Sequence, residues 1–204
     1  MNFLAHLYLS GNDEAITLGN FIADAVKGSH YKQFPDGIAK GILLHREIDH
    51  YTDTHPIFRK SKSRLSPKYG IYSGIIVDIY YDHFLSKYWN EYSEEDLHEV
   101  VARTYFLLFR KYHLLPARSK RILPFMVTQN WLVGYARFDS LQRVFNGMSR
   151  RTNHLSGMEN AVDDLKADYQ EFEDEFRAFL PDITSHISNF RSNLFSGSAS
   201  IHHQ

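Results

Sequence analysis

The sequence predicts an all-α protein that folds as a single compact domain of many helices. Apolar residues recur at helical spacing along most of the 204 residues. No run alternates apolar and polar residues like a half-buried strand, and no Asn-Gly turn joins two β-branched runs. A hydrophobic content of 43% at this length fits one domain, which we assign to residues 1–195. We expect residues 196–204 to form a disordered tail.

The apolar spacing predicts a series of helices along the chain. Pro35, Pro116 and Pro181 suit positions in a first helical turn, and Ser93 suits an N-cap ahead of three acidic residues. The predicted helices span about 13–27, 35–54, 68–90, 94–113, 117–138, 139–149, 159–179 and 182–194.

Overall charge is nearly balanced, with 23 Lys plus Arg against 24 Asp plus Glu, and gives no case for a nucleic-acid or membrane partner. Locally the charge is uneven. Residues 57–70 hold five basic residues and no acidic one. The predicted helix 159–179 is acidic, and we interpret its charged face as solvent-exposed: Asp163, Asp164, Asp168, Glu171 and Glu175.

The residue types present also limit the possible chemistry and the expected cellular compartment. The absence of cysteine excludes disulfides and thiolate metal sites. The N-terminus has no basic leader, and no segment approaches the roughly 20 apolar residues that span a bilayer. We therefore expect a soluble cytoplasmic protein. Twelve histidines are a mild excess that favours metal or acid–base chemistry.

The predicted helix 35–54 interrupts its own apolar face with charged residues. Ile38 and Ile42 are followed on the same stripe by His45, Asp49 and Asp53, because side chains four residues apart share one helix face. A buried carboxylate without a partner costs several kcal/mol, so a positive group must compensate it.

The predicted helix 68–90 repeats this pattern, with Asp78 and Asp82 inside the stripe Ile71, Ile75, Leu85 and Trp89. Carboxylates and imidazoles are the usual ligands of hard divalent cations. The two helices therefore predict a site for a hard divalent cation such as Mn²⁺ or Mg²⁺. A second interpretation is a polar network in which Arg46, Arg103 or Arg137 pairs with these acids.

Two further residues are ambiguous from position alone. Asp24 lies between Gly19 and Gly28 but off the apolar face of its helix. His6 lies in the apolar stretch MNFLAHLYL, where a core histidine with satisfied hydrogen bonds is the favoured interpretation. A divalent cation on a helical scaffold typically activates water against a phosphoester. No nucleophile elbow, P-loop or dinucleotide fingerprint offers a competing chemistry.

Four segments together resemble the acyl carrier protein phosphodiesterase family: MNFLAHLYLS, GNFIADAVKG, GILLHREIDHYTDTHP and SGIIVDIYYDHFL. The resemblance is dense over the first 90 residues and continues more loosely, through MVTQNWLVGYA and LQRVFNGMSRRT, to about residue 180. It implies a manganese-dependent enzyme that releases 4′-phosphopantetheine from holo acyl carrier protein. It also implies a fold distantly related, with rearrangement, to the HD-domain metal phosphohydrolases.

The interrupted stripes predict His45, Asp49, Asp78 and Asp82 as metal ligands and catalytic residues, with Asp24 as a further candidate ligand and His83 as a further catalytic candidate. The chain departs from the HD pattern, since it contains no His-Asp dipeptide and has the reverse order at Asp49–His50 and Asp82–His83. Ligand assignment by analogy with HD enzymes is therefore unsafe.

Substrate contacts are predicted from basic residues near these positions. Arg46 and Lys27 are candidates to bind phosphate. Because the carrier protein implied as substrate is acidic, we expect Arg59, Lys60 and Arg64 to form its docking surface.

Two other functions stay open: a metal phosphohydrolase acting on a nucleotide or another small phosphoester, and a non-catalytic helical interaction protein. A small-molecule enzyme would not need the basic segment, and metal content of the purified protein separates both enzymes from the interaction protein.

Overall fold

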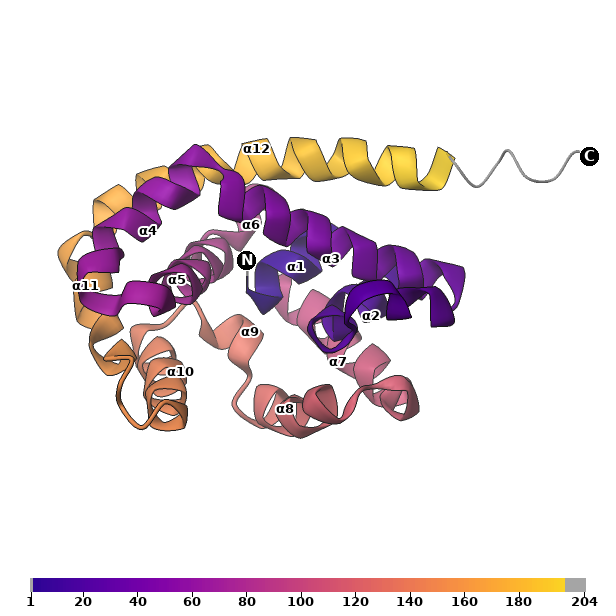
Figure 1. Cartoon of the computed structure of the whole chain (residues 1–204), viewed down its shortest axis with the longest axis horizontal. Coiled ribbons are helices and arrows are strands. Elements are labelled where there is room, and N and C mark those ends of the chain that lie inside the picture. The colour runs from indigo at the N-terminus through magenta and orange to yellow at the C-terminus, as the bar shows by residue number, and fades with distance from the viewer. Residues whose placement is uncertain (1, 197–204) are drawn as a thin grey trace, which may run out of the picture.

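The computed structural model describes residues 2–196, and within this range all regular secondary structure is helical (Figure 1). The all-α prediction is confirmed for the part of the chain described. Residues 197–204 of the predicted tail lie outside it. The α-helices are α1 (Phe3–Ser10), α2 (Glu14–Ile22), α3 (Asp36–Thr54), α4 (Pro56–Tyr69), α5 (Ser73–Lys87), α6 (Trp89–Tyr92), α7 (Leu97–Arg110), α8 (Ala117–Thr128), α9 (Trp131–Gly134), α10 (Phe138–Arg151), α11 (Ala161–Ala167) and α12 (Tyr169–Ser196). Short 3-10 helices connect them: η1 (Ala23–Ala25), η2 (Gly28–Gln33), η3 (Gly70–Tyr72), η4 (Tyr112–Leu114) and η5 (Met158–Asn160).

Helix α1 is held in place by a residue far along the chain. The backbone N–H groups of Leu4 and Ala5 donate to the two carboxylate oxygens of Asp82, at 2.8 and 3.0 Å. An isolated helix of eight residues is marginal in water, so this cap and the burial of Leu4 and Leu9 account for its formation. The predicted set of helices missed α1 because its cap comes from α5.

Helices α2 and α3 approach each other closely through two glycines. A Cβ atom on Gly19 would lie 2.1 Å from the carbonyl oxygen of Ile38, and one on Gly41 would lie 2.3 Å from that of Ile16. Only glycine fits at either position without moving the backbone. This contact brings the end of α2 and the 3-10 helix η1 against the middle of α3.

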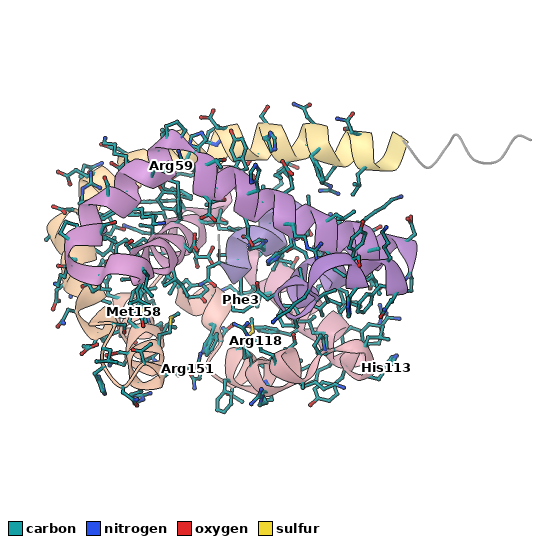
Figure 2. The ribbon with its side chains drawn as sticks, viewed as in Figure 1. Phe3, Arg59, His113, Arg118, Arg151 and Met158 are labelled. Atoms are coloured by element: carbon teal, nitrogen blue, oxygen red, sulfur yellow. The ribbon has the colours of Figure 1, made fainter. Side chains whose placement is uncertain are left out.

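The basic segment 57–70 is helical, although no helix was predicted for residues 55–67. Pro56 occupies the first turn of α4, and the ring of His55 accepts from the N–H of Ile57. Figure 2 shows Arg59 at the outer edge of the molecule on this helix. The acidic helix packs against α4, and Glu175 is only 5% exposed, so its predicted exposure is wrong.

Charge pairs join α4 to α11 and α12. Glu175 accepts from both terminal nitrogens of Arg64 at 2.8 Å, from Ser61 at 2.5 Å, and lies 3.2 Å from Nζ of Lys60. Lys68 pairs with Asp164 at 2.7 Å. The basic and acidic segments that the sequence singled out thus neutralise each other.

Several predicted boundaries are corrected by the structure. Pro181 lies inside α12, which runs without a break where two helices were expected. Asp96, not Ser93, caps α7 by accepting from the N–H groups of His98 and Glu99. Ile71 and Ile75 are 88% and 40% exposed, so the apolar stripe predicted along α5 does not continue into its N-terminal end.

The core lies where α5 meets α4 and α12, and it is rich in aromatic rings. Tyr80, Tyr81 and Phe84 of α5 contact Phe172, Phe176 and Phe179 of α12, and all are fully buried. Helix α1 packs against both α3 and α5, the two helices that carry the interrupted apolar stripes. Within residues 2–196, no helix combines the length and apolar character that crossing a membrane requires.

Candidate metal centre

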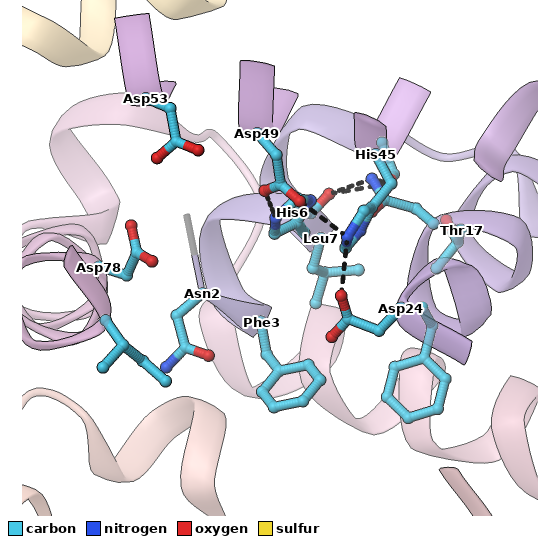
Figure 3. Close-up of a pocket in the computed structure, with 14 residues that line it drawn as sticks. Asn2, Phe3, His6, Leu7, Thr17, Asp24, His45, Asp49, Asp53 and Asp78 are labelled. Atoms are coloured by element: carbon cyan, nitrogen blue, oxygen red, sulfur yellow. Dashed lines mark hydrogen bonds and ion pairs between the residues drawn. The ribbon is translucent and has the colours of Figure 1, made fainter. Parts of the chain in front are cut away.

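A cavity of about 310 Å³ opens between α1, α2, α3 and α5, and its polar lining comes from all four regions (Figure 3). His6 belongs to α1, and Asp24 to η1 directly after α2. His45, Asp49 and Asp53 lie at successive turns of α3, and Asp78 faces the cavity from α5. The interrupted stripe on α3 therefore faces a cavity, where its polar side chains reach solvent.

Three side chains converge at one end of the cavity. Nε2 of His6 lies 3.1 Å from one carboxylate oxygen of Asp49, and Nε2 of His45 lies 3.1 Å from the other. Among the described residues, His6, His45 and Asp49 form a set whose ligand atoms all lie within 4.8 Å of one another. Two imidazole nitrogens and a carboxylate oxygen suit a hard or borderline divalent cation.

Asn20 fixes the orientation of the His45 ring. The Asn20 amide nitrogen donates to the His6 carbonyl at 3.1 Å and to the Ser10 hydroxyl at 2.8 Å, so its oxygen faces His45. Nδ1 of His45 donates to that oxygen at 2.9 Å. Nε2 is consequently the nitrogen that faces the cavity, as in metal sites whose histidines are oriented by a second hydrogen bond.

Asp24 completes the cluster, with one carboxylate oxygen 3.4 Å from Nε2 of His45. Burial alone would lower the pKa of His45, but hydrogen bonds to Asp24 and Asp49 raise it to about 9. The bond to His45 also lowers the pKa of Asp24. At neutral pH a proton on His45 therefore neutralises part of this acidic group, which is the role that a bound cation would take.

The other two cluster residues respond to burial in different ways. Burial lowers the pKa of His6 to about 4, despite its hydrogen bond to Asp49, so the ring is neutral at pH 7. Burial would raise the pKa of Asp49, but the hydrogen bonds from His45 and His6 outweigh it and lower that pKa. A neutral imidazole beside an ionised carboxylate is the protonation state that metal ligation requires.

Asp78 and Asp53 line the cavity away from this cluster, as Figure 3 shows. Burial raises the pKa of Asp78, and the charges of Asp49 and Asp53 raise it further. The structure thus brings Asp78 to the same cavity as Asp24, His45 and Asp49, but outside the compact set of three.

Asp82 and His83 lie elsewhere. Both oxygens of Asp82 accept from the N-terminal N–H groups of α1, and the residue is fully buried, so its contacts support a structural role and not metal ligation. His83 donates from Nδ1 to the Tyr135 carbonyl and accepts at Nε2 from the Tyr169 hydroxyl. Neither residue lines the cavity.

The residues predicted to bind phosphate, Arg46 and Lys27, and those predicted to dock the carrier protein, Arg59, Lys60 and Arg64, are paired within the chain or lie away from the cavity. Arg46 donates to the carbonyl of Val26 at 2.8 Å and stacks over Tyr31, which anchors the loop after η1. Lys27 is exposed and does not line the cavity. Arg59 donates to the carbonyl of Asp53, while Lys60 and Arg64 pair with Glu175.

Sequence reasoning missed two residues of the site: His6, which belongs to the cluster, and Asn20, which orients His45. An apolar neighbourhood favoured a core role for His6, and nothing in the sequence connects it to Asp49, 43 residues away. Asn20 is buried and follows Gly19, which lies at the tight α2–α3 contact. Its position next to this glycine was the one sequence feature that could have indicated a buried polar role.

The fold and the cavity define a class: an all-helical protein with a histidine–aspartate cluster in an open acidic cavity. The chain belongs to the acyl carrier protein phosphodiesterase family, whose model matches residues 1–183. It is thereby a member of a family of hydrolases.

Curated relatives match this chain over nearly their full length. The acyl carrier protein phosphodiesterase of Yersinia enterocolitica serotype O:8 is 31% identical over 186 residues, which cover 91% of this chain and 96% of the relative. That of Enterobacter sp. strain 638 is 32% identical over 190 residues, with 93% and 98% covered. That of Escherichia coli O139:H28 is 33% identical with the same coverage. No solved structure matches the chain significantly.

Proposed function

We propose that this protein hydrolyses the phosphodiester between 4′-phosphopantetheine and the serine of acyl carrier protein, using a divalent cation held by His6, His45, Asp49 and Asp24. Family membership supports the substrate. The convergence of two Nε2 atoms on the carboxylate of Asp49 is the observation that supports the cation, with manganese the first choice and magnesium an alternative.

Electrostatics of the cavity supports the same proposal. Four carboxylates line it: Asp24, Asp49, Asp53 and Asp78. A phosphodiester carries a negative charge and would be repelled by them, since like charges in a partly desolvated site cost several kcal/mol. A cation held by His6, His45, Asp49 and Asp24 would offset this repulsion and would supply the Lewis-acid chemistry that activates water against a phosphoester.

The residues of the chain then have distinct roles. Asn20 orients His45 through its Nδ1 proton, and Asp49 divides its two oxygens between the rings of His6 and His45. Asp78 extends the acidic wall on the α5 side, where we propose that it is an additional ligand or holds water near the phosphorus atom. We leave Asp82 out of the ligand set because α1 uses both of its oxygens.

We also propose that the fold is a rearranged relative of the HD-type phosphohydrolases. Histidine and aspartate ligands on neighbouring helices support this relation. The reversed Asp-His order in the sequence and the contribution of His6 from the first helix distinguish it from that group.

Mass spectrometry tests the function directly. Holo carrier protein is incubated with the purified protein and Mn²⁺, and loss of the phosphopantetheine group is followed by intact mass. We expect complete conversion with Mn²⁺ and none with excess EDTA. Hydrolysis of nucleotides or simple phosphodiesters without conversion of the carrier protein would support the second function considered above. A protein that neither binds metal nor hydrolyses either substrate would be an interaction protein.

A further inference from the structure

A long basic stretch lies in the C-terminal half of the chain, away from α4. Residues 100–158 contain a single acidic residue, Asp139. The same stretch contains ten basic residues: Arg103, Arg110, Lys111, Arg118, Lys120, Arg121, Arg137, Arg143, Arg150 and Arg151. It covers most of α7 and all of α8, α9 and α10.

The basic residues of this stretch differ from those of α4 in their partners. On α4, Lys60, Arg64 and Lys68 are paired with acids of α11 and α12. On α8 and α10, four exposed arginines form no ion pair with any described residue: Arg118, Arg121, Arg150 and Arg151. Their charge is available to a partner, whereas most of the charge of α4 is not.

A groove of about 440 Å³ runs between α8, α9 and α10, and we call it the α8–α10 groove. Phe125, Trp131 and Met148 give it an apolar floor, and Arg143, Arg150 and Arg151 line its rim. Phe125 is 57% exposed, so it offers apolar surface to a partner at this groove. Aromatic residues, methionine and arginine are the types enriched in protein–protein interfaces.

The α8–α10 groove begins where the metal cavity ends. Asn2 lines both, and its amide nitrogen donates to the Tyr135 hydroxyl in the wall of the groove at 3.0 Å. On the other side, Arg118 shares a small hollow with Phe3 and Asp24, which also line the metal cavity. Figure 2 shows Phe3 and Arg118 near the centre of the view, with Arg151 beside them toward α10.

We propose that the α8–α10 groove is the docking surface for the acidic face of the carrier protein, in place of the α4 surface expected from the sequence. The inference rests on the proposed function, which makes a protein the substrate. A negatively charged surface would pair with Arg150 and Arg151, and its apolar contacts would cover Phe125. Docking here brings the modified serine to the side of the cavity that Asn2 forms.

The experiment measures binding apart from catalysis. Fluorescently labelled apo carrier protein, the reaction product, is titrated with wild-type protein and with the Arg150→Glu/Arg151→Glu variant. Two charge reversals should weaken binding by about tenfold or more, and salt should weaken wild-type binding much more than binding by the variant. Lys32→Glu/Lys62→Glu carries the same change of net charge at two exposed positions outside the groove and should bind like wild type.

A charge-neutralising variant and a small-substrate assay distinguish loss of docking from loss of the fold or of the metal site. Arg150→Gln/Arg151→Gln removes the charges without placing acids at the C-terminal end of α10, and should show a smaller loss in the same direction. Hydrolysis of bis(p-nitrophenyl) phosphate at the metal site should be unchanged in all these variants. Circular dichroism checks that they are folded.

The outcomes separate the inference from the function. If wild type releases phosphopantetheine but the arginine variants bind apo carrier protein normally, the docking surface is wrong and the function stands. Equal losses in the lysine control, which includes Lys62 of α4, would mean that net charge or the α4 surface determines binding, and either result overturns the inference. If wild type neither hydrolyses nor binds carrier protein but binds a labelled single-stranded oligonucleotide through Arg150 and Arg151, both the function and the protein partner are wrong.

Discussion

The imidazole rings of His6 and His45 stack with their centroids 4.1 Å apart, and each directs Nε2 at the same carboxylate, that of Asp49. The two rings come from α1 and α3, so the stack exists only after these helices pack. Without a cation, Asp49 holds the rings together by hydrogen bonds. In the function proposed above, the same three groups would hold the cation.

Loss of the His6 ring or of the Asp49 carboxylate should abolish metal binding. We expect His6→Ala and Asp49→Ala to lose bound Mn²⁺ and to reduce phosphodiesterase activity by more than about 100-fold. Asp49→Ala should also lower the stability of the metal-free protein, because His45 loses a carboxylate partner. Metal content by mass spectrometry and denaturation in EDTA measure the two effects. His50→Ala, at the exposed neighbouring position, is the control and should behave as wild type. Full metal content in His6→Ala would exclude His6 as a ligand.

Asp82 should be structural. In Asp82→Ala the N–H groups of Leu4 and Ala5 lose their acceptors inside the protein, at a cost of about 2–3 kcal/mol of unfolding free energy. Asp82→Asn keeps one acceptor oxygen and should cost less. Hydrogen exchange should show α1 opening in the alanine variant while α12 remains protected. A stable Asp82→Ala protein that had lost only its metal would instead return Asp82 to the ligand set.

The ion pair between Arg64 and Glu175 should contribute to stability more than to catalysis. Arg64→Ala leaves a carboxylate that is 5% exposed without its bidentate partner, at a cost of about 3 kcal/mol in denaturant unfolding. Lys62→Ala, an exposed residue of the same helix, should change stability by less than about 0.5 kcal/mol. Replacing both Arg64 and Glu175 by leucine should recover much of the loss. If Arg64→Ala instead raised only the KM for carrier protein, the α4 docking surface would be supported.

His83 should make stability depend on pH. Burial lowers its pKa from 6.5 to about 4, so the unfolded chain takes up a proton in this range and the folded one does not. Stability is therefore fully present above pH 6.5 and falls as the pH decreases to about 4, by about 3 kcal/mol. Denaturant unfolding in EDTA at several pH values should show a smaller decrease in His83→Gln. His113→Gln, at an exposed position, should keep the wild-type dependence. Equal slopes in all three proteins would contradict this origin.

Helical spacing predicted α3 almost to the residue, because its apolar face and its start at Pro35 are local properties of the sequence. The same reasoning missed α1, whose N-terminal cap is 78 residues away at Asp82. It also treated Asp78 and Asp82 alike, since both lie on one stripe of α5. Their surroundings differ, because Asp78 faces a cavity and Asp82 faces a helix terminus. Spacing identifies a face of a helix, but only packing decides what that face meets.

The charged segments show the same limit. Residues 57–70 looked available to a partner because they contain no acid, but Glu175 and Asp164 reach them from the other end of the chain. The stretch 100–158 has fewer basic residues per turn, so its charge does not stand out in the sequence. Only the folded structure brings its arginines, on α8 and α10, close to hollows that share residues with the metal cavity.

The position of Asn2 has a practical consequence for handling the protein. Because Asn2 forms part of the wall shared by the metal cavity and the α8–α10 groove, any peptide fused ahead of it starts at the entrance to both. A polyhistidine affinity tag there would bring competing imidazoles to the cation and extra chain to the docking surface. In Figure 1 the C-terminal half of α12 lies on the far side of α3 from α8. A tag fused after this helix therefore starts away from the metal cavity.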